Sequence, residues 1–234
     1  MLLASVAAMA KKDKKVEVVA PVAPVEVVAA APTMEQNISY ALGANFGTSI
    51  ITLRDNYSFD LDTNFLIKGM LDAYGKRLKM STEDIRDIFS ELDKMVKERE
   101  NAKLAVTKRA GEMFLEMNRN AAGIRETASG LQYKVITEGK GPKPTASSTV
   151  KVHYHGTTID GQVFDSSVQR GEPITFQLNQ VIEGWKEGLQ LMTVGSKYIF
   201  YIPSKLAYGD RGAGDVIPGG AALIFEIELL DIEK

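Results

Sequence analysis

The stretch over residues 81–123 constrains the fold of this chain most, because it contains no proline and its first glycine is Gly111. It opens with Ser81-Thr82-Glu83-Asp84, in which a serine stands three residues before an acid, as in a helix capping box. Apolar residues recur at helical spacing along the stretch, while its middle is dense in charged residues. This pattern predicts one helix over about residues 82–121, which would be ~60 Å long at ~1.5 Å per residue. We therefore predict a solvated spacer whose N-terminal part packs into a helical module.

Two shorter amphipathic helices are predicted before the spacer. Apolar residues fall at helical spacing between Met34 and Tyr74, and a segment rich in Asn, Asp and Ser at residues 54–61 predicts the connection. A helical domain of three helices over residues 34–123 leaves apolar surface exposed. We therefore expect a homodimer formed through the N-terminal helices, with a monomeric helical domain as the alternative.

After Gly123 the sequence changes to short runs of alternating apolar and polar residues, separated by Gly, Pro and Asp-Gly. Residues 150–155 show this alternation, and Asp160-Gly161 predicts the turn of a hairpin. One short amphipathic helix, around Trp185, lies between the runs. A single helix packed across a mostly antiparallel sheet is an α+β arrangement. We predict it for residues 124–234, after the all-α domain, with aromatic side chains on the concave face of the sheet.

The N-terminal ten residues, MLLASVAAMA, are apolar, end in Ala-Met-Ala and are followed by several lysines. This pattern is typical of the end of a secretory signal peptide, so residues 1–10 are predicted to be a signal-peptide remnant of a periplasmic or cell-envelope protein. The alternative is a disordered apolar N-terminus on a cytoplasmic protein. Ten residues fall short of the ~20 that cross a bilayer, so no transmembrane span is expected. Residues 11–33, rich in Val, Ala and Pro, predict a disordered linker.

The composition excludes several classes of function. With 28 Lys and Arg against 30 Asp and Glu, the net charge is −2, and no overall field attracts nucleic acid. The chain has no cysteine, which removes disulfides, thiolate zinc sites and cysteine nucleophiles. Its two histidines, His153 and His155, would share the strand face opposite Tyr154 and have no evident third ligand. We therefore expect neither a metal nor a cofactor.

Five segments of the C-terminal half resemble the FK506-binding-protein family of peptidyl-prolyl cis-trans isomerases. They occur in that family's order and spacing within residues 130–234: VHYHG, DGQVFDSS, VIEGWKEGLQLMTVG, LAYGDRGAG and VIPGGAALIFEIELLDIE. The helical half resembles the Mip-like bacterial subgroup, whose N-terminal domain dimerises and holds two isomerase domains apart. The resemblance implies an FKBP-like enzyme that accelerates rotation about X-Pro bonds in unfolded or partly folded client proteins. A proline-binding chaperone or adaptor module with little turnover is the alternative.

The lack of an evident nucleophile fits this reaction. Rotation about an X-Pro bond crosses a barrier of ~18–20 kcal/mol because the planar amide loses its resonance on twisting. An apolar cavity disfavours the charge-separated planar amide, and a cavity that fits the twisted amide lowers the barrier further. In principle, no proton donor is required.

The resemblance also assigns the residues of the pocket. Trp185 would form the floor beneath a pyrrolidine ring, and Tyr208 would donate a hydrogen bond to a substrate carbonyl. Asp165 is a candidate partner for the buried hydroxyl of Tyr154. Taken singly, each residue is also compatible with core packing alone. The implied catalytic residues are Tyr154, Phe164, Asp165 and Tyr208, and the implied substrate-binding residues are Phe176, Val181, Ile182, Trp185, Ile217 and Phe225.

Two positions depart from the family pattern. Ile174 and Leu206 stand where many members carry aromatic residues, so we expect one rim of the pocket to be looser. Macrolide inhibitors are among the ligands that the resemblance implies, and these departures leave their affinity open.

Overall fold

The computed structural model describes residues 31–233. The expected signal-peptide remnant at residues 1–10 and most of the expected linker at residues 11–33 lie outside the described residues. In the described range, no helix has both the length and the apolar character needed to cross a membrane. The chain divides into two units between Leu53 and Arg54.

Helix α1 spans Met34–Tyr57 and helix α2 spans Thr63–Tyr74. The connection between them is shorter than the predicted residues 54–61, because α1 continues through the polar residues. Polar side chains are compatible with a last helical turn, and the helix ends where Ser58 adopts a positive φ of 55°. Asp62 then caps α2 with its carboxylate, which accepts hydrogen bonds from two backbone N–H groups of the first turn.

The long helix α3 spans Thr82–Arg119 and so ends slightly before the predicted boundary. The expected capping box is present: Ser81 Oγ accepts from the Asp84 N–H at 3.1 Å, and the Asp84 carboxylate accepts from the Ser81 N–H at 3.0 Å. The buried residue of α3 is Gly111, where an added methyl group would lie 3.1 Å from Ala222 Cβ in the C-terminal half. The helix therefore packs against the C-terminal half around Gly111, while apolar residues of its N-terminal part, such as Ile85, Leu92 and Met95, are partly buried.

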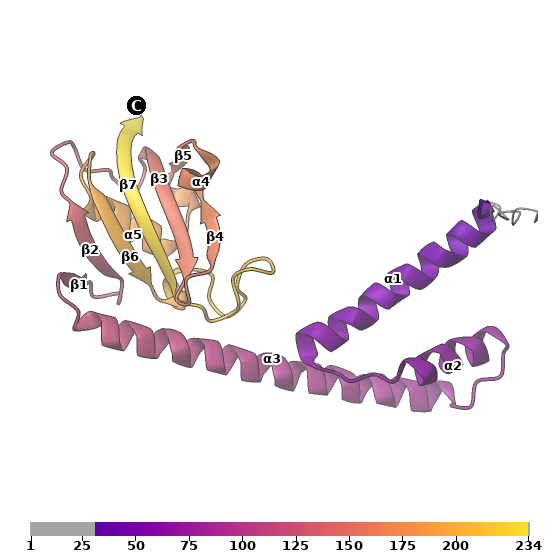
Figure 1. The fold of residues 1–234 in the computed structure, drawn as a ribbon. Helices are drawn as coiled ribbons and strands as arrows, with labels where there is room; N and C mark the ends of the chain where they lie inside the picture. The colour runs from indigo at the N-terminus through magenta and orange to yellow at the C-terminus, as the bar shows by residue number, and fades with distance from the viewer. Residues whose placement is uncertain (1–30, 234) are drawn as a thin grey trace, which may run out of the picture. The chain divides into compact units, whose positions relative to one another are not determined.

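The C-terminal half forms an antiparallel sheet with strand order β1-β2-β6-β7-β3-β4, and β5 pairs with the remaining part of the β3 edge. Figure 1 shows β7, in yellow, beside β3. The α+β prediction is confirmed. The strands are β1 Ile124–Glu126, β2 Gln132–Thr137, β3 Thr149–Thr158, β4 Val163–Ser166, β5 Ile174–Gln177, β6 Lys197–Ile202 and β7 Leu223–Glu233. The connecting helices are α4 Ser167–Arg170, η1 Leu178–Gln180, α5 Glu183–Leu191 and η2 Ser204–Leu206.

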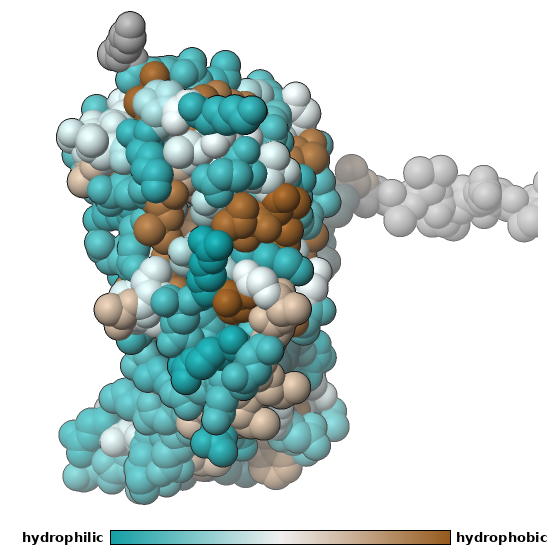
Figure 2. All heavy atoms as spheres, turned by 90° about the vertical axis from the view of Figure 1, so that its left-hand side faces the viewer, coloured by the Kyte–Doolittle hydropathy of each residue, from teal (hydrophilic) through white to brown (hydrophobic). Residues whose placement is uncertain are grey.

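Helix α5 packs on one face of this sheet and closes the hydrophobic core. Gly188 brings it close to β6, since a methyl group added there would lie 2.7 Å from Phe200 Cε1. The side of the molecule that carries β1 and β2 is largely hydrophilic, with hydrophobic residues in small separate groups (Figure 2). The apolar side chains are instead concentrated between helix and sheet, where their burial contributes ~25 cal/mol per Å². Alternate residues of three strands are buried there: Val150, Val152, Tyr154, Tyr198, Phe200, Ile202, Leu223, Phe225, Ile227 and Leu229.

Candidate active site

A cavity of about 480 Å³ lies between α5, the strands β3, β4 and β7, and the loop that follows β6. Most of the residues that the resemblance assigned to the pocket line it: Tyr154, Phe164, Asp165, Val181, Ile182, Trp185, Tyr208, Ile217 and Phe225. The exception is Phe176, whose ring packs against Trp185 at a centroid distance of 5.3 Å without lining the cavity. Ile174 lines the cavity, whereas Leu206, the other residue expected at its rim, does not. Gln180, Ala213 and Val216 line the cavity without a signal in the sequence pattern.

Trp185 forms the centre of an aromatic cluster at the base of the cavity. Its indole is 6% exposed and meets the rings of Tyr154 and Phe225 edge to face, at centroid distances of 5.2 and 5.1 Å. Among the described residues, its Nε1 atom is buried without a hydrogen-bond partner. Edge-to-face contacts of this kind are favourable and directional, so they fix the plane of the indole.

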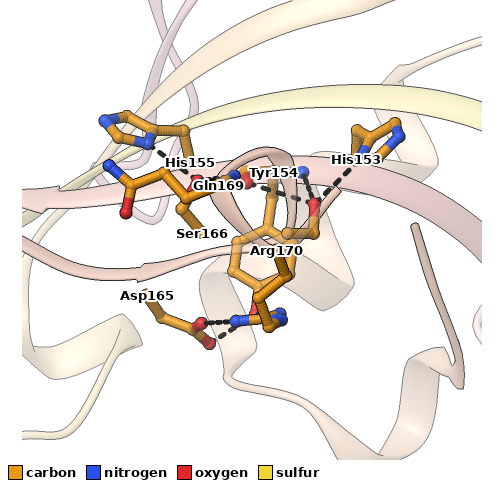
Figure 3. Close-up of polar contacts among 8 residues, drawn as sticks. His153, Tyr154, His155, Asp165, Ser166, Gln169 and Arg170 are labelled. Atoms are coloured by element: carbon orange, nitrogen blue, oxygen red, sulfur yellow. Dashed lines mark hydrogen bonds and ion pairs between the residues drawn. The ribbon is translucent and has the colours of Figure 1, made fainter. Parts of the chain in front are cut away.

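The Tyr154 hydroxyl is held by two charged side chains (Figure 3). It donates a hydrogen bond to the Asp165 carboxylate and accepts one from Arg170 Nη2 at 2.8 Å. Arg170 also forms an ion pair with Asp165 through Nη1. The hairpin between β3 and β4 brings Tyr154 and Asp165 together, and α4 then returns the chain so that Arg170 reaches both. The sequence did not identify Arg170 as a site residue, because no local pattern indicates that α4 brings this side chain back to Tyr154.

The charges of this group are set by its surroundings. Burial raises the pKa of Tyr154, and the hydrogen bond to Asp165 raises it further, against an opposite effect of Arg170. For Asp165, burial acts to raise the pKa, but the hydrogen bonds from Tyr154 and Arg170 outweigh it and the pKa is lowered. Tyr154 is therefore a neutral phenol and Asp165 a carboxylate near pH 7. The carboxylate accepts hydrogen bonds from Tyr154 and Arg170, which fix the direction of the Tyr154 hydroxyl.

Serine side chains fix the backbone on both sides of Tyr154. Ser167 Oγ accepts a hydrogen bond from the Tyr154 N–H at 2.8 Å and lies 3.0 Å from His153 Nδ1. Ser166 Oγ lies 3.0 Å from His155 Nδ1. Both histidines extend away from the Tyr154 ring, as the alternation along β3 predicts (Figure 3). They therefore lie outside the cavity and tie β3 to the start of α4.

Tyr208 enters the cavity from the loop between β6 and β7 and is 39% exposed. Burial raises the pKa of its phenol, and the negative charge of Asp165 raises it further, so the hydroxyl stays protonated at neutral pH. The loop folds back on itself through paired hydrogen bonds between Ala213 and Ile217, at 2.9 and 3.1 Å. A protonated hydroxyl at the edge of an apolar cavity can donate a hydrogen bond to a bound ligand.

The site thus offers an apolar floor, the oriented hydroxyl of Tyr154 and the protonated hydroxyl of Tyr208, and it holds its carboxylate in an ion pair. Such a cavity, between one helix and an antiparallel sheet of this order, defines an FKBP-like prolyl isomerase domain. Residues 141–230 match the family of FKBP-type peptidyl-prolyl cis-trans isomerases, and residues 35–135 match the domain amino terminal to such isomerases. The chain belongs to this family of enzymes, which confirms the expectation of an isomerase that acts on X-Pro bonds in protein folding.

Individual relatives support this conclusion along most of the chain. The FKBP-type peptidyl-prolyl cis-trans isomerase FkpA of Aeromonas hydrophila is 46% identical over 213 residues, which cover 88% of this chain and 79% of that protein. The FKBP-type 22 kDa peptidyl-prolyl cis-trans isomerase of Escherichia coli is 42% identical over 205 residues, covering 86% and 96%. The crystal structure of FkpA from Escherichia coli matches with a TM-score of 0.68 at 35% identity, covering 87% of this chain and 99% of that one.

Proposed function

We propose that the cavity binds a proline of an extended client segment, with the pyrrolidine ring lying on the indole of Trp185. The observation that carries this proposal is the convergence of three rings on that indole. The rings of Tyr154, Phe176 and Phe225 have centroids 5.2, 5.3 and 5.1 Å from it. They hold the indole as a flat apolar floor, and burying an apolar ring on such a floor is favourable.

The walls of the cavity would then promote rotation. Val181, Ile182 and Phe164 replace water around the bound amide with apolar side chains. The planar amide is more charge-separated than the twisted amide, so loss of water raises its free energy more and reduces the barrier. Tyr208 donates a hydrogen bond to a backbone carbonyl of the client and so orients the bound segment. Tyr154 presents its ring to the cavity in an orientation set by Asp165 and Arg170.

A protease-coupled isomerisation assay on a proline peptide tests these roles. Tyr208→Phe removes only the hydroxyl, and we expect kcat/KM to fall about threefold to tenfold, as for one lost hydrogen bond of ~0.5–1.5 kcal/mol. The matched control is Tyr201→Phe, because the Tyr201 ring packs outside the cavity against Phe114 at a centroid distance of 6.0 Å. Equal rates in the two variants would overturn the role of Tyr208. Binding of the peptide without acceleration by the wild type would indicate a binding module instead.

The helical half is proposed to join two chains and hold their cavities apart for one client. Large apolar side chains are exposed on its helices, and two cavities on one dimer raise the effective concentration of an extended client. Light scattering on the full chain tests the dimer, and the mass of a single chain would contradict it. The exposed residues on α2 and α3 include Phe65, Leu71, Tyr74, Ile88 and Phe89.

The proposed location is the periplasm or the cell envelope. One relative, from Legionella longbeachae, is named an outer membrane protein, MIP, and is 41% identical over 207 residues that cover 86% of this chain. Mass spectrometry of the mature N-terminus tests export, because retention of Met1 would contradict cleavage.

Macrolide inhibitors are proposed to enter the same cavity with an affinity limited by its rim. Ile174 lines this rim without the ring that many family members have there. Ile174→Tyr should therefore tighten macrolide binding, which fluorescence of Trp185, the chain's one tryptophan, can measure.

A further inference from the structure

Helix α3 contacts the loop that carries Tyr208. A methyl group added to Gly220 at the end of this loop would lie 2.6 Å from Lys108 Cγ and 3.0 Å from Leu104 Cδ1. At Gly219 an added methyl group would lie 3.4 Å from the same Leu104 atom. In addition, Lys108 Nζ lies 2.7 Å from the carboxylate of Asp210. The helix that sequence analysis treats as a spacer thus touches both arms of an active-site loop.

Backbone hydrogen bonds within the loop connect these contacts to Tyr208. The Gly220 N–H donates to the carbonyl of Gly209, the residue after Tyr208, at 2.8 Å. The Gly209 N–H in turn donates to the Ser204 carbonyl at 2.9 Å, which closes the loop on the other side of Tyr208. A displacement of Gly220 is therefore passed to Tyr208 through one hydrogen bond and one peptide unit.

Helix α3 contacts this loop over only part of the surface that faces it. A hollow of about 390 Å³ lies beneath it, between α3 and the loop, so the packing there is incomplete. Both α3 and loop residues line this hollow, among them Lys108, Gly111, Leu115, Pro203, Lys205 and Gly220. Beside this hollow, the contacts of Leu104 and Lys108 with Gly220 add support from α3 to the hydrogen bonds that the loop makes within itself.

The end of α3 is in turn fixed to the sheet. The buried Gln132 side chain on β2 donates to the Leu115 carbonyl and to the Glu126 carboxylate, both at 2.8 Å, and accepts from Asn118 Nδ2 at 2.9 Å. A buried amide with all these partners resists displacement. The part of α3 that holds the loop therefore keeps a set position relative to the strands that build the cavity.

We propose that Leu104 and Lys108 of α3 are positioning residues that hold the Tyr208 loop over the bound proline. The helical arm then belongs to the catalytic apparatus, in addition to joining the domains. This proposal rests on the proposed role of Tyr208 as a hydrogen-bond donor. Leu104 acts by packing, whereas the Lys108–Asp210 pair is partly exposed to solvent, with 39% and 62% of the two side chains accessible, and contributes less.

The test uses the full chain in the coupled isomerisation assay. Leu104→Ala should lower kcat/KM about threefold to tenfold, as expected for coupled neighbouring residues. Leu104→Met, which keeps a large apolar side chain, should retain most of the wild-type kcat/KM. Val106→Ala is the matched control on the same helix, because Val106 is 70% exposed. In a Tyr208→Phe background, Leu104→Ala should cause little further loss, since the hydroxyl that it positions is gone. Hydrogen exchange at the Gly220 amide should be faster in Leu104→Ala than in Val106→Ala.

The outcomes separate this proposal from the role of Tyr208. An equal loss from Leu104→Ala in both backgrounds would show general destabilisation and overturn the positioning role. Unchanged exchange at Gly220 would overturn it as well. If Tyr208→Phe alone keeps the wild-type rate, the donor role fails, whereas faster exchange at Gly220 in Leu104→Ala still establishes that α3 holds the loop.

Discussion

The Trp185 indole and the Phe225 ring meet edge to face at the base of the cavity, with centroids 5.1 Å apart and planes at 82°. Trp185 comes from α5 and Phe225 from β7, so this contact joins the helix to a strand in the interior of the sheet. The floor of the cavity is therefore also part of the hydrophobic core. Substitutions at the floor must change stability together with activity.

Trp185→Ala should lower the free energy of unfolding by about 3–5 kcal/mol, the usual cost of removing a large buried aromatic side chain. Trp185→Phe should lower the free energy of unfolding much less, because it keeps an aromatic ring. In addition, Nε1 has no hydrogen-bond partner among the described residues, so its removal leaves no polar group unpaired. Urea unfolding followed by circular dichroism measures both values. An equal loss in the two variants would contradict the expectation that a phenyl ring keeps most of the packing at this position.

Asp165 should make stability depend on acidic pH. Its pKa is lowered in the folded chain, so its contribution is complete above the unfolded value of about 3.9 and is lost as the pH falls through the folded pKa. The melting temperature of Asp165→Asn should therefore lie below that of the wild type at neutral pH, and the gap should close as the pH falls through the lowered pKa of Asp165. The exposed Asp215→Asn variant is the control, and a gap that persists in acid would contradict this assignment.

Tyr198 should make stability depend on alkaline pH. Burial raises the pKa of its phenol to about 12, helped by the hydrogen bond that its hydroxyl donates to Glu138 at 2.8 Å. Because the unfolded value is about 10, its contribution is present below pH 10 and is lost as the pH rises toward 12. Tyr198→Phe should flatten the fall in melting temperature over this range. An unchanged slope would show that other phenols, such as Tyr201, dominate.

Gly188 and Gly69 both lie inside helices, but substitution by alanine should change the free energy of unfolding in opposite directions at the two positions. A methyl group at Gly188 would lie 2.7 Å from Phe200 Cε1, so Gly188→Ala should destabilise by about 1–3 kcal/mol through overpacking. At Gly69 nothing among the described residues lies within 4 Å of an added methyl group, so Gly69→Ala should stabilise by up to about 1 kcal/mol. Thermal or urea unfolding measures both, and a stabilising Gly188→Ala would show that α5 can move away from β6.

Local patterns predicted the elements of this fold well. The capping box at Ser81 marks the start of α3, and Asp160-Gly161 lies between β3 and β4 as expected. Alternation along β3 places Tyr154 on the buried face and the histidines on the other. These features depend on neighbours within a few residues, which is the range over which a sequence pattern carries direct information.

Features that depend on distant segments were not predictable in the same way. Gly111 is a poor helix former by propensity, and only the fold shows that it allows α3 to approach Ala222. Arg170 reaches Tyr154 because α4 reverses the chain, and Phe176 packs against Trp185 instead of lining the cavity. Much of the candidate site came from family resemblance, which carries tertiary information that periodicity lacks.

The placement of β7 has a consequence for how this chain is made. β7 follows every other strand in chain order, yet it pairs with β6 on one side and along β3 from Thr149↔Glu233 to Thr158↔Leu223 on the other. While the ribosome is still adding β7, the edges of β3 and β6 that it will cover are unpaired, and Phe225 is missing from the pocket. The helices, which rely on local contacts, can form earlier. This prolyl isomerase domain therefore gains its own activity only once β7 has been added and has paired, and it cannot assist the folding of its own strands before then.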